Sequence, residues 1–394
     1  MIITIFEDND HKNLFPLNIN RASCELRCGA FTNIERLQNH LNPSDKIQLL
    51  VRDELAQFLS IKYPNLLINP KIIEPSTWIN GRCIVSTEFL TKISKGSSYS
   101  CTGKLIAFKT NKNILYNNYQ AYIDDNILVS EEIKVDCINN IWDAIFLQAK
   151  MIIKDSEYFF EMNHGKIHPT VSIENGDNIF IAKDSIVKAG AVLDASLGPI
   201  IISEKSIIDI GSLIQGPVYI GPNCVINPGS KLRKNITLGP MCKIGGELED
   251  VIFQGYTNKQ HDGYLGHSYI GEWVNLGANT NTSDLKNNYG NIRLEIDQDI
   301  IETGRQFLGS LIGDFTRTGI STMLNTGTVI GLGANVYGGD FQKKYIKSFQ
   351  WGVNSKTDLE KFLFTIEIMK KRRNMRLVKE EIILLSKLYE KNIN

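Results

Sequence analysis

The segment ISEKSIIDIGSLIQGPVYIGPNCVINPGSKLRKNITLGPMCKI (202–244) carries isoleucine or leucine at every sixth position. The series is Ile202, Ile208, Ile214, Ile220, Ile226, Leu232, Leu238 and Ile244. Neither the 3.6-residue period of a helix nor the two-residue period of a strand gives this spacing. A short strand and a tight turn together take about six residues, and three such units close one triangular coil. We therefore predict a parallel β-helix of hexapeptide repeats, with the ladder residues filling one aliphatic column.

The ladder continues beyond this segment but is interrupted twice. Its later members are Tyr264, Ile270, Leu276, Ile312, Thr318, Leu324, Ile330 and Val336. Residues 246–263 and 281–311 break the six-residue period, so we expect them to loop out or to form distorted coils. Loops on a rigid scaffold often carry binding and catalytic residues. The coils as a whole are expected over about 167–338.

Four regions of the chain differ in their pattern of apolar and polar residues. Apolar runs such as IQLLVRD (47–53) and WINGRCIV (78–85) alternate with helix-like segments, which is typical of an α/β domain of the Rossmann-like class. The expected organisation is an α/β domain (1–138), a connecting helix (139–164), the β-helix (165–345) and a C-terminal helical segment that caps it (346–394).

Composition narrows the classes of function. Lys plus Arg and Asp plus Glu number 43 each, so no net basic charge favours nucleic acid. No apolar run approaches the roughly 20 residues needed to span a bilayer, and acidic residues stand where a signal peptide would carry basic ones. We expect a cytoplasmic protein. Its seven scattered cysteines are expected to be reduced thiols, with no bound metal among them.

Proton-handling chemistry is concentrated in KQHDGYLGHSYIGEWVNLGANTNTSDLKNNYG (259–290). His261 lies in a ladder break, where an imidazole could take a proton from an attacking amine or hydroxyl. Asn275 and the backbone amides of Gly277 and Ala278 could stabilise an oxyanion. The alternative is a turn histidine bonded to backbone. His267, inside a repeat, is interpreted as a corner residue.

These residues also carry a family resemblance. HDGYLGHSYIGEWVNLGANT resembles the acetyltransferase signature of the bifunctional N-acetylglucosamine-1-phosphate uridylyltransferase/glucosamine-1-phosphate N-acetyltransferase family. Over nearly the whole chain, the sequence is similar to a variant branch of sugar nucleotidyltransferases with a shortened N-terminal domain. The resemblance implies a left-handed β-helix, acetyl-CoA as the acyl donor, and a homotrimer with its sites between neighbouring prisms.

The same resemblance implies roles for individual residues. His261 matches the general base, while Tyr264 and Asn275 match residues that line the amino-sugar site. Asn288 and Tyr289 match the asparagine–tyrosine pair of a loop that meets the acceptor. Ala278, beside Gly277, matches a backbone contact to the acetyl group. The family's phosphate-binding lysine falls near the acidic ELED (247–250), so Lys259 is considered as its substitute.

The N-terminal domain departs from the nucleotidyltransferase pattern at two places. EDND (7–10) stands where the family has a glycine-rich phosphate loop, and Arg82 replaces a metal-binding aspartate. Either Arg21, Arg27 and Arg82 supply the missing positive charge for a nucleoside triphosphate, in which case Mg²⁺ would be its cofactor, or the domain has lost this activity.

The expected function is acetyl-CoA-dependent N-acetylation of an amino sugar phosphate resembling glucosamine 1-phosphate. Nucleotidyl transfer giving a UDP-N-acetyl sugar could be coupled to it. Two alternatives stay open. One is acyl transfer to a hydroxyl or to a nucleotide-linked amino sugar, with an inactive N-terminal domain. The other is a non-catalytic trimeric scaffold.

Overall fold

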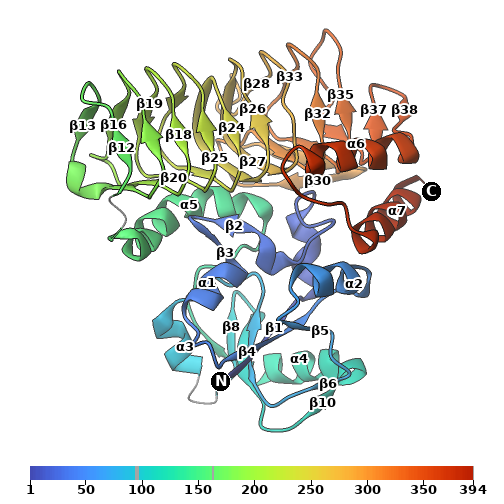
Figure 1. Cartoon of the computed structure of the whole chain (residues 1–394). Coiled ribbons are helices and arrows are strands. Elements are labelled where there is room, and N and C mark those ends of the chain that lie inside the picture. The colour runs from blue at the N-terminus through green and yellow to red at the C-terminus, as the bar shows by residue number, and fades with distance from the viewer. Residues whose placement is uncertain (94–96, 162–163, 394) are drawn as a thin grey trace.

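The computed structural model describes residues 1–93, 97–161 and 164–393, and it contains an α/β domain beneath a long β-helix (Figure 1). The α/β domain has a seven-stranded sheet in the order β11-β8-β9-β7-β1-β4-β5. Strand β1, next to the central strand β7, pairs in parallel with β4 and β7, whereas β9 is antiparallel to β7. The strands are β1 (Ile2–Phe6), β4 (Lys46–Leu50), β5 (Leu67–Ile68), β7 (Thr77–Asn80), β8 (Tyr99–Cys101), β9 (Lys104–Lys109) and β11 (Glu131–Glu132).

Four helices and two small ribbons complete this domain. The helices are α1 (Asn33–Asn39), α2 (Asp53–Lys62), α3 (Thr87–Ile93) and α4 (Tyr119–Leu128). The ribbons pair β2 (Arg27–Cys28) with β3 (Phe31–Thr32) and β6 (Ile72–Ile73) with β10 (Ile114–Leu115). The 3₁₀ helix η1 (Asn9–Leu14) follows β1 directly.

Three stacks of short parallel strands, here called faces A, B and C, form the β-helix. Face A contains β12 (Lys166–Ile167), β15 (Ile186–Val187), β18 (Ile207–Ile208), β21 (Val225–Ile226), β24 (Lys243–Ile244), β26 (Asn258–Lys259), β32 (Arg317–Thr318), β35 (Asn335–Val336) and β37 (Gln350–Trp351). Face B contains β13 (Ser172–Glu174), β16 (Val192–Asp194), β19 (Leu213–Gln215), β22 (Lys231–Leu232), β28 (Asn281–Thr282) and β33 (Met323–Leu324). Face C contains β14 (Ile179–Ile181), β17 (Ile200–Ile202), β20 (Val218–Ile220), β23 (Ile236–Leu238), β31 (Ser310–Ile312), β34 (Thr328–Ile330) and β36 (Tyr345–Ile346).

Two longer strands, β25 (Glu247–Gly255) and β27 (Tyr264–Glu272), bend from face B into face C. The first ladder break is therefore a distorted stretch of coil rather than an extruded loop. The second break does leave the prism after β28 and returns as β31, carrying an antiparallel hairpin of β29 (Arg293–Ile296) and β30 (Asp299–Glu302). Strand β38 (Ser355–Lys356) folds back on β37.

The predicted column is confirmed. All eight ladder residues from Ile202 to Ile244 are at most 2% exposed and share one aliphatic core. Tyr264 is an exception: it is half-buried on the outside, and Leu265 takes the inward position. Leu265 and Ile270 are only five residues apart because β27 bends without a full turn between its faces, so the six-residue count from Ile270 reaches the wrong residue.

The connecting helix α5 (Ile141–Asp155) covers the outside of face C and lies between the two domains (Figure 1). Its Trp142, Ile145 and Met151 belong to one buried cluster with Tyr269 and Leu311 of face C. The expected C-terminal helices are α6 (Leu359–Lys371) and α7 (Lys379–Ile393). No helix in the described part of the chain is both long and apolar enough to cross a bilayer.

Candidate active site

A cavity of about 490 Å³ opens at the edge where face A turns into face B. At this edge, five residues separate the inward-facing Ile226 and Leu232, but only three separate Ile244 and Leu248 in the next coil. The shortened corner removes two residues from the edge and leaves a gap between its neighbours. This notch is lined by Asn227, Pro228, Gly245, Gly246, Gln260, His261, Asp262, Ala278 and Asn279.

His261 lies at the notch with an exposed side chain, one coil beyond the shortened corner. An imidazole in this position can meet a ligand held along the edge, as a general base requires. Ala278 lines the same notch from the following coil. The structure therefore brings together two of the residues that the sequence analysis singled out.

The expectation for Gly277 is wrong. Its backbone amide donates to Thr318 Oγ1 at 2.9 Å, so it has no free N–H for an oxyanion. A Cβ at this glycine would lie 2.5 Å from the carbonyl oxygen of Gly319, so the residue serves close packing between coils. Asn275 also lies away from the notch, on face A, where its Oδ1 accepts from Asn258 Nδ2 at 3.4 Å.

Tyr264 and the loop residues lie on the face-B side of the edge. Tyr264 begins β27, and its hydroxyl donates to Asp284 Oδ2 at 2.9 Å. Asn288 and Tyr289 are in the loop that leaves face B; Tyr289 is 68% exposed. Gln306 Nε2 donates to the carbonyl oxygen of Tyr289 at 2.9 Å and so holds the loop's own fold. Neither loop residue lines the notch.

The side chain of Lys259 is buried inside the prism and cannot reach a ligand at the notch, so its expected role in binding phosphate is wrong. It occupies the inward position of face A beside Ile244 and is only 2% exposed. Its Nζ donates to the carbonyl oxygens of Gly245 and His261, each at 2.9 Å. Burial lowers the pKa of Lys259 to about 8, while the negative charge of Asp262 opposes this shift.

We expect this buried amine to make stability rise with pH above 8. Between pH 8 and about 10.5, the unfolded chain holds a proton on Lys259 that the folded protein has released. The gain across this window is at most about 3 kcal/mol. Urea unfolding of wild type and Lys259→Met at pH 7.5 and 10 measures it, because the difference between the two unfolding free energies should change by this amount. A difference independent of pH would contradict the expectation.

A second polar cluster, which the sequence analysis missed, lies where face B turns into face C. His267 Nδ1 is 2.8 Å from Asp284 Oδ2, and its Nε2 is 3.6 Å from Asp250 Oδ2. The imidazole stacks on Phe307, with ring centroids 5.1 Å apart. A signal existed: Asp250, His267 and Asp284 are each 17 residues apart, about one coil, so the repeat would have aligned them. His267 is a corner residue, as expected, but one held between two carboxylates.

Burial and these contacts shift the neighbouring groups. Burial, reinforced by the charge of Asp284, raises the pKa of Tyr264. Burial also raises the pKa of Asp250, against the pull of His267. For Asp284 burial acts upward too, but its bonds to His267 and Tyr264 prevail and lower its pKa. The Tyr264 hydroxyl is therefore a proton donor fixed toward Asp284.

In the N-terminal domain, the edge at the end of β1 is filled by ion pairs. Arg82 Nη2 lies 2.5 Å from Asp8 Oδ2 and 3.4 Å from Asp10 Oδ2. Asn80 Nδ2 donates to Asp8 at 2.7 Å, and Lys104 Nζ is 3.0 Å from Asp10. Both carboxylates thus face cations of the chain itself. This arrangement does not fit a Mg²⁺ ion, and we derive no metal-dependent step from it.

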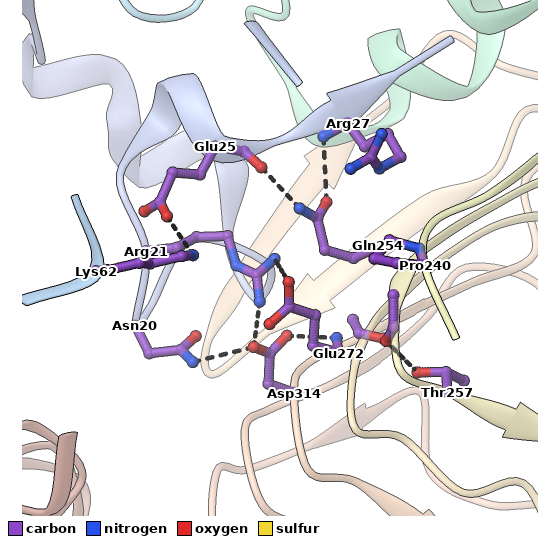
Figure 2. Close-up of polar contacts among 12 residues, drawn as sticks. Asn20, Arg21, Glu25, Arg27, Lys62, Pro240, Gln254, Thr257, Glu272 and Asp314 are labelled. Carbon is purple, nitrogen blue, oxygen red and sulfur yellow. Dashed lines mark hydrogen bonds and ion pairs between the residues drawn. The ribbon is translucent and has the colours of Figure 1, made fainter. Parts of the chain in front are cut away.

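Arg21 and Arg27 do not join Arg82 in a phosphate-binding cluster. Figure 2 shows Arg21 directed at Asp314 and Glu272 of the β-helix. Arg21 is 3% exposed and Asp314 is 1% exposed. The Arg27 guanidinium donates to the carbonyl oxygen of Ala30 and pairs with Glu35. The Arg21 guanidinium is thus paired across the interface between the domains and that of Arg27 within its own domain, so the expectation that they bind a nucleotide together with Arg82 is wrong.

The charged contacts at this interface are supported by neutral ones. The backbone amide of Arg27 donates to Gln254 Oε1 at 3.1 Å, and Gln254 Nε2 donates to the carbonyl oxygen of Glu25 at 2.7 Å (Figure 2). Asn20 Nδ2 donates to Asp314 at 3.0 Å. Across residues 1–93, 97–161 and 164–393, no group of three or more His, Cys, Asp or Glu side chains is arranged to hold a metal ion.

Comparison with known proteins places the N-terminal part of the chain. Residues 3–162 match the family model described as sugar nucleotidyl transferase. The resemblance expected from the sequence is confirmed. A Sulfurisphaera tokodaii protein named bifunctional sugar-1-phosphate nucleotidylyltransferase/acetyltransferase is 36% identical over 100 residues, 25% of each chain. A Methanococcus aeolicus protein named bifunctional protein GlmU is 32% identical over 93 residues, 23% of this chain and 22% of that protein. The matches span about a quarter of the length of these curated relatives.

Solved structures match the chain as well, among them the two that follow. UDP-N-acetylglucosamine acyltransferase from Campylobacter jejuni matches over 57% of this chain and 83% of its own, at 18% identity and a TM-score of 0.28. The polySia-specific acetyltransferase NeuO matches over 54% of this chain and 95% of its own, at 12% identity and a TM-score of 0.27. At these TM-scores, neither structure supports an argument about the site.

Proposed function

We propose that the β-helix transfers an acetyl group from acetyl-CoA to the amine of an amino sugar phosphate, with His261 as the general base. The observation that carries this proposal is an exposed histidine at a notch cut into an otherwise regular prism edge. The imidazole would take a proton from the attacking amine while the amine nitrogen forms a bond to the acetyl carbonyl carbon. Collapse of the tetrahedral intermediate would break the carbon–sulfur bond, and the imidazolium would return its proton to the departing sulfur, so that CoA leaves as the thiol and His261 is again neutral.

The names of the relatives support this reading. Both curated proteins quoted above are called bifunctional, and one name includes acetyltransferase activity. A purely structural trimeric scaffold does not explain a shortened corner with a histidine beside it, so we favour the enzyme over the scaffold. Glu247 and Glu249 on face B would repel a phosphate, so an amine on a nucleotide-linked sugar, or a hydroxyl, is the second candidate acceptor.

Nucleotidyl transfer by the N-terminal domain has weaker support. The match of residues 3–162 to sugar nucleotidyl transferases favours it. The Asp8–Arg82 ion pair opposes it, because the pair occupies the strand end where that family is expected to bind phosphate and metal. We therefore propose the acyl transfer as the activity of this chain, with the N-terminal domain as a structural partner of the β-helix.

Release of free thiol from acetyl-CoA tests the proposed reaction. The full chain is assayed with a panel of amino sugars bearing no phosphate, a 1-phosphate or a nucleoside diphosphate, and with matched sugars bearing a hydroxyl in place of the amine. Thiol release that requires the amine, with mass spectrometry showing a product heavier by one acetyl group, is the expected result. Thiol release only with the sugars that bear a hydroxyl would contradict transfer to an amine and would show that the acceptor is a hydroxyl group.

We also propose a homotrimer, because a notch on the edge of one prism is shallow and a neighbouring prism would supply its second wall. Light scattering at micromolar concentration should then give about three times the 44.4 kDa of one chain. A monomer at the same concentration, fully active in thiol release, would show that one prism forms the whole site.

A further inference from the structure

Hydroxyl groups tie together several corners of the edge between faces A and B. At four of these corners, a serine or threonine just before the face-B strand donates to the carbonyl oxygen three residues earlier. The bonds are Ser212 to Asp209 at 2.8 Å, Ser230 to Asn227 at 2.6 Å, Thr280 to Gly277 at 2.8 Å and Thr322 to Gly319 at 2.9 Å. Each of these bonds joins two residues of the same turn and stabilises it.

The two corners at the notch have glycine in place of this hydroxyl. Gly246 precedes β25 and Gly263 precedes β27. Lys259 Nζ instead donates to a carbonyl oxygen in each of these corners. One acceptor is Gly245, the first residue of its corner as Asp209 and Asn227 are, and the other is His261, the second residue of its corner. A Cβ on Gly246 would lie 2.8 Å from Nζ, so the glycine also makes room for the amine.

The turn that carries His261 differs in backbone conformation as well. At Gly211, Gly229, Asn279 and Ser321, the left-handed residue is the one just before the Ser or Thr position. In the His261 turn, the positive φ moves one residue on, to Gly263 (φ 127°). The amide of Asn279 then bonds to the carbonyl oxygen of Asp262 at 2.9 Å. This unusual turn leaves His261 at the rim of the notch.

We propose that Lys259 is a positioning residue: its Nζ bonds to one carbonyl oxygen in each of two successive corners that lack the hydroxyl, and so holds the turn that presents His261. The inference rests on the proposed acyl transfer for its meaning in catalysis. Within the described residues, no carboxylate forms an ion pair with Nζ, although burial of an unpaired ammonium is costly. A methionine or leucine would fill the column more stably. We therefore attribute the amine at this position to the two corner carbonyl oxygens that it binds.

Lys259→Met separates this role from a purely structural one. The substitution keeps the apolar stem and removes both donors, and Lys243→Met, on the outer side of the adjacent strand of face A, is the matched control. We expect Lys259→Met to melt at or above the wild-type temperature at pH 7. Its kcat should fall by about 10- to 100-fold, because small displacements of a catalytic group have effects of this size. Its KM for acetyl-CoA should change by less than about threefold, and Lys243→Met should leave kcat unchanged.

NMR of the histidine Cε1–H group gives a readout that does not depend on activity. With His261 assigned by comparison with His261→Gln, its resonance should move or broaden in Lys259→Met and stay in place in Lys243→Met. A lower melting temperature, with kcat per folded molecule and the His261 resonance both unchanged, would overturn the proposal. If the wild type transfers no acetyl group, the proposed function fails, but the resonance still decides whether Lys259 holds the His261 turn.

Discussion

Replacing His261 with alanine is expected to lower kcat by roughly 10²–10⁴-fold while leaving the affinity for acetyl-CoA nearly intact. The side chain is exposed at the notch, so its removal should cost little stability. The profile of kcat/KM against pH should also lose its acidic limb, because protonation of the base would no longer stop the reaction. Steady-state kinetics between pH 5.5 and 9, with thermal melting of each variant, measures these changes.

His168→Ala is the matched control, since His168 is another exposed histidine that follows a face-A strand, several coils away. It should retain wild-type kcat. His267→Ala should instead lower the melting temperature, because it leaves Asp250 and Asp284 facing each other without the imidazole. Loss of turnover in His267→Ala together with full turnover in His261→Ala would assign the base to the other histidine.

Breaking the buried ion pair between the domains is expected to have the largest effect on stability. Arg21→Met removes the cation that faces Asp314 and Glu272 and leaves their carboxylates uncompensated. Loss of one partner of a buried pair costs about 3–5 kcal/mol, because the remaining charge stays in a poorly solvated site. Denaturant unfolding at pH 7 should show this loss. The double variant Arg21→Met/Asp314→Leu should recover part of it, since it removes the stranded charge.

An exposed ion pair provides the control for this experiment. Arg293 and Glu302 pair at 2.6 Å across the β29–β30 hairpin, but both side chains are about 60% exposed. Arg293→Met should therefore cost less than about 1 kcal/mol. Equal losses in Arg21→Met and Arg293→Met would show that the N-terminal domain is not clamped to the β-helix by Arg21.

The six-residue period predicted the β-helix because each ladder residue reports an inward position, and burial of Ile202 through Ile244 follows directly. The period fails where corners change length. The shortened corner after Ile244 made residues 246–263 resemble an insertion, and the bend in β27 moved the inward position from Tyr264 to Leu265. Counting by coils of about 17 residues would have aligned Asp250 with His267.

The errors among the site residues have a common physical cause. Lys259, Arg21 and Arg27 are phosphate-binding candidates only because the family's own phosphate-binding groups are missing from this sequence, and because lysine and arginine are usually exposed. The groups that pair with these buried residues cannot be identified from the neighbouring sequence. Arg21 pairs with Asp314, which lies 293 residues further along the chain, and Lys259 donates to backbone carbonyl oxygens, which every residue carries. His261 and Ala278 line the same notch because their motif spans neighbouring coils, and their roles in acyl transfer stay predictions.

Hydrogen–deuterium exchange of the full chain with and without acetyl-CoA tests most directly whether the notch is the acyl-transfer site. We expect slower exchange in peptides covering 258–267 and 277–283, which form the notch and the start of β27. Exchange should be unchanged at 7–14 and 80–84, where Asp8 and Arg82 close the N-terminal edge. Protection confined to 7–14 and 80–84, with the notch peptides unchanged, would contradict it.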